Sequence, residues 1–173
     1  MDNMGVLIFF CGKMGSGKST LAKTLASERN AVLLSEDEWL SSLYPNQITT
    51  LSDYLKLSDL IKPLIYELVQ NILKTGSNVV MDFPANTISQ REWFNRLCSE
   101  IGSEHEMFYL NVSNKVCLDR LHKRRTEQPE RAKYDNEGVF NQVTQYFESP
   151  SPNEEMNIVE FSRPLPQGDI DVR

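Results

Sequence analysis

Residues 12–20 read Gly-Lys-Met-Gly-Ser-Gly-Lys-Ser-Thr and fill every position of the pattern G-x-x-x-x-G-K-[ST]. Residues 6–11, just before them, are an apolar run rich in strand-forming residues, and the segment after them has the apolar spacing of a helix. A glycine-rich turn could match the pattern by chance, but a true phosphate-binding loop needs a strand on one side and a helix on the other. Both are expected here, so the sequence predicts such a loop.

The residue types in this loop suit a nucleoside triphosphate. Glycines let the backbone curl until its N–H groups point inward, which forms a concave site for phosphate oxygens. The helix that starts near Gly17 adds the positive end of its dipole. Lys18 can place its charge between the β- and γ-phosphates, and the Ser19 hydroxyl can coordinate a magnesium ion. The loop residues expected to bind ATP are Gly12, Lys13, Met14, Gly15, Ser16, Gly17, Lys18, Ser19 and Thr20.

The composition is that of one globular domain. The chain has 173 residues, 40% of them hydrophobic, which is enough to bury a core. The formal charge of −6 argues against a protein whose whole surface binds nucleic acid, although residues 115–133 form a basic segment. Cys11, Cys98 and Cys117 lie in apolar segments without C-x-x-C spacing, so we expect buried, reduced thiols.

The sequence gives no indication of export or of insertion into a membrane. The first residues lack a basic region before their apolar run, and no apolar run approaches the length of a membrane span. The expected location is the cytoplasm. The sequence gives no indication of the oligomeric state.

Segments with strand character alternate with helical segments along the whole chain. After residues 6–11, strands are expected at 31–34, 78–82, 107–110 and 157–161, and this alternation predicts an α/β fold. The sheet should be parallel, with about five strands and helices on both faces. Pro63 should kink the long helix over residues 51–73 or divide it, with Ser58 or Asp59 capping the second part. Residues 1–161 should form the domain, and residues 162–173 a flexible C-terminal tail.

Two carboxylates follow strands at the edge where open parallel sheets bind ligands. Asp37 comes after the second strand, in Ser35-Glu-Asp-Glu38, and could act on a substrate; equally, Ser35 or Asp37 could simply cap the next helix, over residues 38–43. Asp82 ends the third strand and is expected to reach the magnesium ion through a water molecule, with a solvated strand-end residue as the alternative.

With these features the chain resembles the P-loop kinases from about Val6 to Phe161. The likeness is greatest to the AAA-domain group that also resembles chloramphenicol phosphotransferases and polynucleotide 5′-kinases. The resemblance implies a P-loop NTPase three-layer sandwich that uses ATP and Mg²⁺. In these relatives an aspartate after the second strand acts as base toward the acceptor hydroxyl, and Asp37 matches that position. Leu40 stands where those families often place an arginine.

Residues 119–125, Asp-Arg-Leu-His-Lys-Arg-Arg, are similar to the segment that enters the lid of adenylate-kinase-like enzymes. The resemblance implies a small lid over approximately residues 120–136, with Arg120 stacked on or beside the adenine and Arg124 near the phosphates. Arg125 has no definite role, and a solvated basic helix face is the alternative for the whole segment. Residues 82–86, Asp-Phe-Pro-Ala-Asn, are similar to the D-G-F-P-R segment of nucleoside monophosphate kinases. Ala85 replaces the arginine that holds the substrate phosphate there, which argues against a nucleoside monophosphate substrate.

The sequence therefore predicts an ATP-dependent phosphotransferase that acts on a hydroxyl group of a small molecule. Lys18, Asp37 and Arg124 are the expected catalytic residues, and Ser19 and Asp82 the expected metal ligands. One other reading is an ATP-binding switch or ATPase that acts through a protein partner. Another is a nucleic-acid 5′-kinase, which the basic segment permits and the acidic remainder disfavours. The sequence lacks an N/T-K-x-D guanine pattern, which favours adenine.

Overall fold

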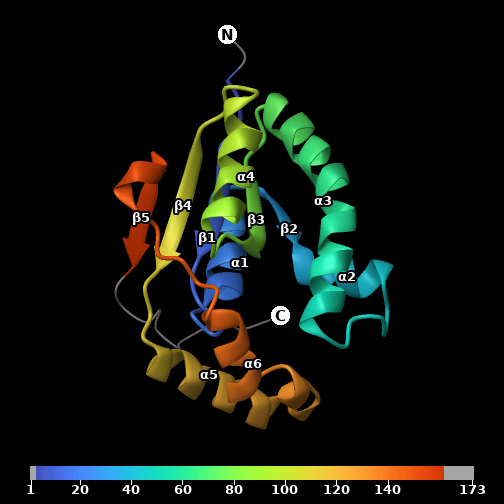
Figure 1. Ribbon diagram of the computed structural model, residues 1–173. Helices are drawn as coiled ribbons and strands as arrows, with labels where there is room; N and C mark the ends of the chain where they lie inside the picture. The colour runs from blue at the N-terminus through green and yellow to red at the C-terminus, as the bar shows by residue number, and fades with distance from the viewer. Residues whose placement is uncertain (1–2, 162–173) are drawn as a thin grey trace.

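The computed structural model describes residues 3–161, and its five strands form one parallel sheet (Figure 1). The strands are β1 (Leu7–Cys11), β2 (Val32–Ser35), β3 (Val79–Pro84), β4 (His105–Leu110) and β5 (Ile158–Phe161). Their order across the sheet is β2-β3-β1-β4-β5, and the neighbouring strands pair in parallel. The predicted parallel sheet of about five strands is confirmed. The predicted tail, residues 162–173, lies outside the described residues.

Helices cover both faces of the sheet. The α-helices are α1 (Lys18–Glu28), α2 (Glu36–Leu43), α3 (Leu51–Lys74), α4 (Ile88–Ser99), α5 (Asn114–Glu127) and α6 (Glu137–Thr144), and the short 3₁₀ helices are η1 (Pro129–Lys133) and η2 (Pro152–Glu154). Alternate side chains of β1 enter different cores: Leu7, Phe9 and Cys11 pack with α3 and α4, whereas Ile8 and Phe10 pack with α1 and α5. Because β1 is buried on both faces, its sequence is a continuous apolar run. The predicted three-layer sandwich is confirmed.

The ends of α1 and α5 follow their local sequence. Asn30 adopts the left-handed conformation after α1, with φ of 47°, and the N–H groups of Asn30 and Ala31 donate to the carbonyls of Ser27 and Ala26. The Ser113 hydroxyl accepts a hydrogen bond from the N–H of Val116 at the start of α5. Asn30 therefore ends α1, and Ser113 caps the start of α5.

Pro63 does not divide α3, which runs as one helix from Leu51 to Lys74. The predicted second cap is wrong, because Ser58 is buried within the helix and its hydroxyl donates to Glu36 Oε2 at 2.9 Å. The helix begins instead with a capping box in which Thr50 and Asp53 exchange hydrogen bonds. Ile61 and Ile65, on either side of the proline, are buried against the sheet. This packing stabilises the helix across the missing N–H.

Arg91 ties the segment after α6 to the centre of the molecule. Its side chain is fully buried, and its guanidinium bonds both oxygens of Glu154, at 2.5 and 3.0 Å. The same group donates to the carbonyl oxygens of Ala85 and Glu148, at 3.0 and 2.9 Å. One side chain thus connects α4, the end of β3 and the chain returning toward β5. Nothing in the sequence indicated this contact, because Arg91 and Glu154 are 63 residues apart.

No helix within residues 3–161 is long and apolar enough to cross a membrane. Cys11, Cys98 and Cys117 are free and buried, as the sequence predicted. Burial raises the pKa of Cys11 to about 11 and that of Cys98 to about 12. Both thiols therefore stay protonated near neutral pH.

Candidate active site

The glycine-rich loop connects the end of β1 to the start of α1, at the carboxyl edge of the sheet. Gly15 has φ of 79°, and a Cβ added there would lie 2.7 Å from the carbonyl oxygen of Cys117. Gly17, the residue before α1, has φ of 102°. These conformations and this close approach favour glycine, for the reason given by the sequence pattern. The N–H of Gly12 is held by Asn86 Oδ1 at 2.9 Å, a contact that the sequence analysis missed.

Two features of the loop, apart from its sequence pattern, suit an anionic ligand. Ser16 is buried with 1% of its surface exposed, and among residues 3–161 its hydroxyl finds no hydrogen-bond partner. A buried polar atom is normally paired, so an unpaired one beside a ligand loop is a candidate contact. Gly17 offers no side chain to cap the first N–H groups of α1, and such groups are an anion site.

Lys18 lies where the loop meets the two strand-end carboxylates. Its ammonium donates to the carbonyl oxygen of Gly12 and, at 3.0 Å, to that of Lys13. Burial lowers the pKa of Lys18, and the charges of Asp82 and Asp37 act in the opposite direction. The structure therefore brings the predicted lysine and both predicted aspartates into one electrostatic environment.

The register of the sheet places Asp82 beside the entry to α2. Asp82 on β3 pairs with Ser35 on β2. Ser35 is the residue before α2, which begins at Glu36 rather than at Glu38, and its side chain makes no capping hydrogen bond. Asp37 therefore lies inside the first turn of the helix. The alternative in which Asp37 serves as the helix cap is wrong.

Asp37 is surrounded by charges of both signs. The surface of Asp37 is exposed, but the protein on its inner side withdraws the carboxylate partly from water and so raises its pKa, and the negative charge of Asp82 adds to the rise. Arg131, Lys18 and Arg124 act in the opposite direction. A carboxylate with a raised pKa at a ligand edge is a candidate for proton transfer.

The expected metal ligands suit magnesium in type. Ser19 is exposed in the first turn of α1, and Asp82 is half-buried at the end of β3. Within the described part of the chain, no group of three or more His, Cys, Asp or Glu side chains could hold a metal ion. Magnesium at a nucleotide site needs only one or two protein oxygens, because phosphates and water supply the rest. Ser19 and Asp82 would hold it on this arrangement.

Asp82→Asn should weaken magnesium-dependent nucleotide binding more than binding without metal. Only the metal complex uses the negative charge of Asp82, and asparagine keeps the size of the side chain. Titration calorimetry with ATP, with and without magnesium, measures both affinities. Equal losses in the two titrations would instead assign Asp82 a structural role.

Two arginines of the predicted lid share one buried carboxylate. Arg124, near the end of α5, bonds Asp135 through Nε at 2.6 Å and Nη2 at 2.7 Å. Arg131, on η1, bonds the same group through Nε at 2.7 Å. Burial acts to raise the pKa of Asp135, but the hydrogen bonds from both arginines outweigh it and hold the pKa below its usual range. Arg124 was predicted from the sequence and Arg131 was not, although Arg131 lies four residues before Asp135, a spacing that favours a pair on one helical turn.

Three further basic side chains, those of Arg120, Lys13 and Arg125, make hydrogen bonds that fix their positions. Arg120 Nη1 donates to the carbonyl of Ser16 at 2.8 Å, so it packs against the loop backbone. Lys13 reaches Asn114 Oδ1 at 2.7 Å. Arg125 contacts His122 Nδ1 at 2.8 Å. Base contact by Arg120 stays a prediction, and no definite role for Arg125 emerges.

Glu36 is a residue of this region that the sequence analysis did not select. It has 1% of its surface exposed and accepts hydrogen bonds from the hydroxyls of Tyr54 and Ser58, both on α3. Burial raises the pKa of Glu36 to about 7, against the effect of the Ser58 hydrogen bond and of the nearby Lys62 charge. Its position beside Asp37 was the available signal, but nothing local revealed its burial.

Glu36→Gln should make the protein more stable than the wild type as the pH rises. The folded-state pKa lies above the unfolded value, so the stability linked to Glu36 is full below the unfolded pKa and is lost as the pH rises through about 7. At roughly 1.4 kcal/mol per pKa unit, the gain of the variant approaches about 3 kcal/mol above neutral pH. Denaturant unfolding at acidic and alkaline pH measures it. The exposed Glu38→Gln is the control, and a gain independent of pH would contradict the assignment.

The fold and the site together define a class. A parallel sheet with a glycine-rich loop between its central strand and α1, and a strand-end aspartate on β3, is the architecture of the P-loop kinase-like proteins. Within that class, the chain belongs to the AAA domain family, whose sequence model matches residues 7–150.

Solved structures with the same fold include several phosphotransferases. The Mycobacterium tuberculosis APS kinase, in complex with AMPPNP and APS, is 16% identical over 93% of this chain and 91% of its own, with a TM-score of 0.61. A sugar kinase from Janibacter is 16% identical over 91% and 85%, with a TM-score of 0.59. The Pnkp1/Rnl/Hen1 RNA repair complex contains a chain that is 18% identical over 86% of this chain and 48% of its own, with a TM-score of 0.61. These similarities show the fold of the chain. The ligands AMPPNP and APS are those of the APS kinase structure.

Proposed function

We propose that this protein is an ATP-dependent phosphotransferase that moves the γ-phosphoryl group to a hydroxyl of a small molecule. The observation that carries the proposal is the placement of Lys18, Asp82 and Asp37 at one edge of the sheet, beside the glycine-rich loop. A nucleotide switch needs the first two of these groups. A third group, Asp37, with a raised pKa and within electrostatic reach of the other two, suits an acceptor hydroxyl.

The residues divide the task by position. The loop N–H groups and Lys18 bind the phosphates. Ser19 and Asp82 would hold magnesium, which would supply positive charge to the phosphates. Asp37 takes the proton from the acceptor hydroxyl as its oxygen bonds to the γ-phosphorus. Arg124 and Arg131, held together by Asp135, offset negative charge in the transition state. Catalysis is thus mainly positioning and electrostatic stabilisation.

The acidic character outside the basic segment favours a small acceptor over a nucleic acid. The chain carries a formal charge of −6, whereas surfaces that bind nucleic acid are usually basic. The similar structures named as APS kinase and sugar kinase are consistent with a small acceptor. Because one similar structure is an RNA repair complex, a nucleic acid with a free 5′-hydroxyl is the alternative acceptor that the experiment must test.

The test is a phosphotransfer screen with labelled ATP and magnesium across nucleosides, sugars, antibiotics, aromatic alcohols and oligonucleotides with a free 5′-hydroxyl. The expected result is a labelled small-molecule product. Partner capture that depends on nucleotide, with no product from any acceptor, would instead favour a switch.

Lys18→Ala should weaken binding of magnesium-ATP by about ten- to a hundredfold, since a charge-assisted contact to phosphate contributes roughly 1.5–3 kcal/mol. The fold should persist, because within residues 3–161 the ammonium donates its hydrogen bonds to carbonyls of the loop itself, those of Gly12 and Lys13. Titration calorimetry beside a melting curve measures both. Lys23→Ala, at an exposed position on α1, is the matched control. Unchanged affinity in Lys18→Ala would end the assignment of the phosphate loop.

A further inference from the structure

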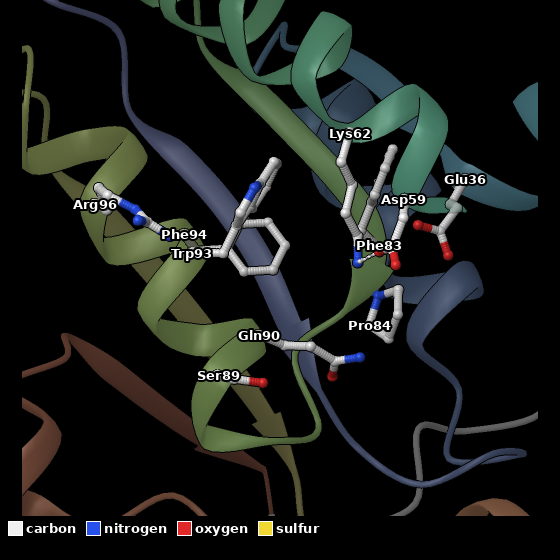
Figure 2. Close-up of a pocket in the computed structure, with 10 residues that line it drawn as sticks. All are labelled: Glu36, Asp59, Lys62, Phe83, Pro84, Ser89, Gln90, Trp93, Phe94 and Arg96. Carbon is white, nitrogen blue, oxygen red and sulfur yellow. Dashed lines mark hydrogen bonds and ion pairs between the residues drawn. The ribbon is translucent and has the colours of Figure 1, made fainter. Parts of the chain in front are cut away.

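A cavity of about 240 Å³ lies between α3 and α4, against the end of β3 (Figure 2). Trp93 and Phe94 on α4 lie across the space from Lys62 and Asp59 on α3, and Gln90 reaches toward Pro84 at its base. The lining residues are Glu36, Asp59, Lys62, Phe83, Pro84, Ser89, Gln90, Trp93, Phe94 and Arg96. No prediction from the sequence included this cavity.

The cavity adjoins the proposed reaction site through two chain connections. Phe83 and Pro84 directly follow Asp82, and Glu36 directly precedes Asp37. The β2–β3 register, in which Ser35 pairs with Asp82, brings these connections side by side. The charges of Asp37 and Asp82 both act on the buried carboxyl group of Glu36, which lines the cavity, so this end of the cavity lies within electrostatic reach of both aspartates.

The walls of the cavity favour a flat apolar group. Phe83, Pro84, Trp93 and Phe94 provide ring surfaces, and the Trp93 and Phe94 rings meet edge to face at 5.1 Å. Phe94 also stacks on Phe9 at 4.2 Å, which fixes its orientation from the core side. Aromatic rings pack well against such surfaces. An apolar cavity of about 150 Å³ accepts benzene, so this one has room for a single ring with short substituents.

One end of the cavity is polar, and Glu36 forms it. The carboxyl group is fixed by the hydroxyls of Tyr54 and Ser58, and each carboxylate oxygen has a second lone pair for another donor. Lys62 and Asp59 pair with each other at 3.2 Å, so neither is a free charge for the ligand. At this end of the cavity, Glu36 therefore favours a hydrogen-bond donor on the ligand.

We propose that this cavity binds the phosphate acceptor of the proposed reaction, and that the acceptor is a small alcohol with one aromatic ring whose hydroxyl end lies beside Glu36. Glu36 orients that end, and Asp37 acts as the base. The acceptor oxygen bonds to the γ-phosphorus, the bond from that phosphorus to the β–γ bridging oxygen breaks, ADP leaves with the electron pair, and the hydroxyl proton goes to Asp37. The transfer step rests on the proposed function, whereas binding of the aromatic alcohol in the cavity does not.

Tryptophan fluorescence can report the cavity directly. The chain has two tryptophans, and in Trp39→Phe the cavity residue Trp93 is the only one left. We expect benzyl alcohol and its ring-hydroxylated derivatives to change the emission of this variant in a saturable way. Glucose, which lacks an aromatic ring, should have no effect. A lack of saturation with every aromatic alcohol, or an equal response to glucose, overturns the proposal.

At a pH well above the pKa of about 7 of Glu36, where its carboxyl group is ionised, Glu36→Gln in the same background should weaken the affinity for the aromatic alcohol about tenfold, the loss expected when a charged acceptor becomes neutral. The amide has nearly the same shape, and the Tyr54 and Ser58 hydroxyls can rotate to suit it. Glu38→Gln, exposed on α2, should bind like the parent. Equal affinities in the Glu36 and Glu38 variants, with both variants folded, overturn the role of Glu36.

Transfer is tested with the same probes and labelled ATP. A phosphorylated aromatic alcohol supports the acceptor assignment, and saturable binding without product overturns it. A separate experiment tests the proposed function. That function requires magnesium-ATP binding that depends on Lys18, and calorimetry measures this binding without any acceptor. Transfer to a sugar or an oligonucleotide alone would keep that function and overturn the aromatic acceptor.

Discussion

Asp37→Asn is expected to lower phosphoryl transfer by about 10²–10⁴-fold while ATP affinity stays nearly unchanged. The carboxylate lies within the first turn of α2, at the edge that holds Lys18 and Asp82, and its pKa is raised first by withdrawal from water and then by Asp82. Asparagine keeps the size and polarity of the side chain but cannot accept a proton. The loss should therefore fall on the chemical step rather than on nucleotide binding.

The measurement is acceptor-dependent product formation, beside calorimetric titration with magnesium-ATP and a melting curve. Glu38→Asn, one residue along α2 and exposed, is the matched control and should keep the wild-type rate. Helix capping does not complicate the result, because Ser35 precedes the helix and Asp37 lies inside it. Wild-type turnover in Asp37→Asn would remove Asp37 as the base and favour a nucleotide switch.

Arg91→Leu is expected to destabilise the fold by about 3–5 kcal/mol. Arg91 is fully buried, and its guanidinium satisfies Glu154 and the carbonyl oxygens of Ala85 and Glu148. Leucine fills part of the volume but leaves one carboxylate and two carbonyl groups without their donor. The penalty is mainly the cost of these unpaired groups, since a buried ion pair itself contributes little net stability.

Denaturant unfolding of Arg91→Leu measures the loss. Arg96→Leu, exposed on the same helix, is the matched control and should stay within about 0.5 kcal/mol of the wild type. Adding Glu154→Leu to Arg91→Leu should restore part of the lost stability, because it removes the unpaired carboxylate. A loss no larger than in the Arg96 control would show that the buried network does not hold the returning segment in place.

The sequence was sufficient for features that depend on neighbouring residues. The strand, glycine-rich loop and helix at residues 6–29 were read correctly, since glycine at positive φ and an apolar period are local properties. The strand-end positions of Asp37 and Asp82 followed from the same reasoning, because parallel strands present their carboxyl ends at one edge. The continuity of α3 through Pro63 did not follow, because packing of Ile61 and Ile65 outweighs the local preference of proline.

Long-range contacts decided the rest. Glu36 and Asp37 are adjacent carboxylates of similar chemistry, yet only Glu36 is enclosed, by Tyr54 and Ser58 from a helix 18 and 22 residues away. Arg91 reads as an ordinary helix residue until Glu154, 63 positions later, meets it in the core. The chain by itself thus determined the nucleotide loop, the parallel α/β architecture and the residue types at the edge of the sheet. Burial and pairing, which set the charge state of each carboxylate and the shape of the cavity, depend on which distant side chains exclude water, and only the tertiary structure decided them.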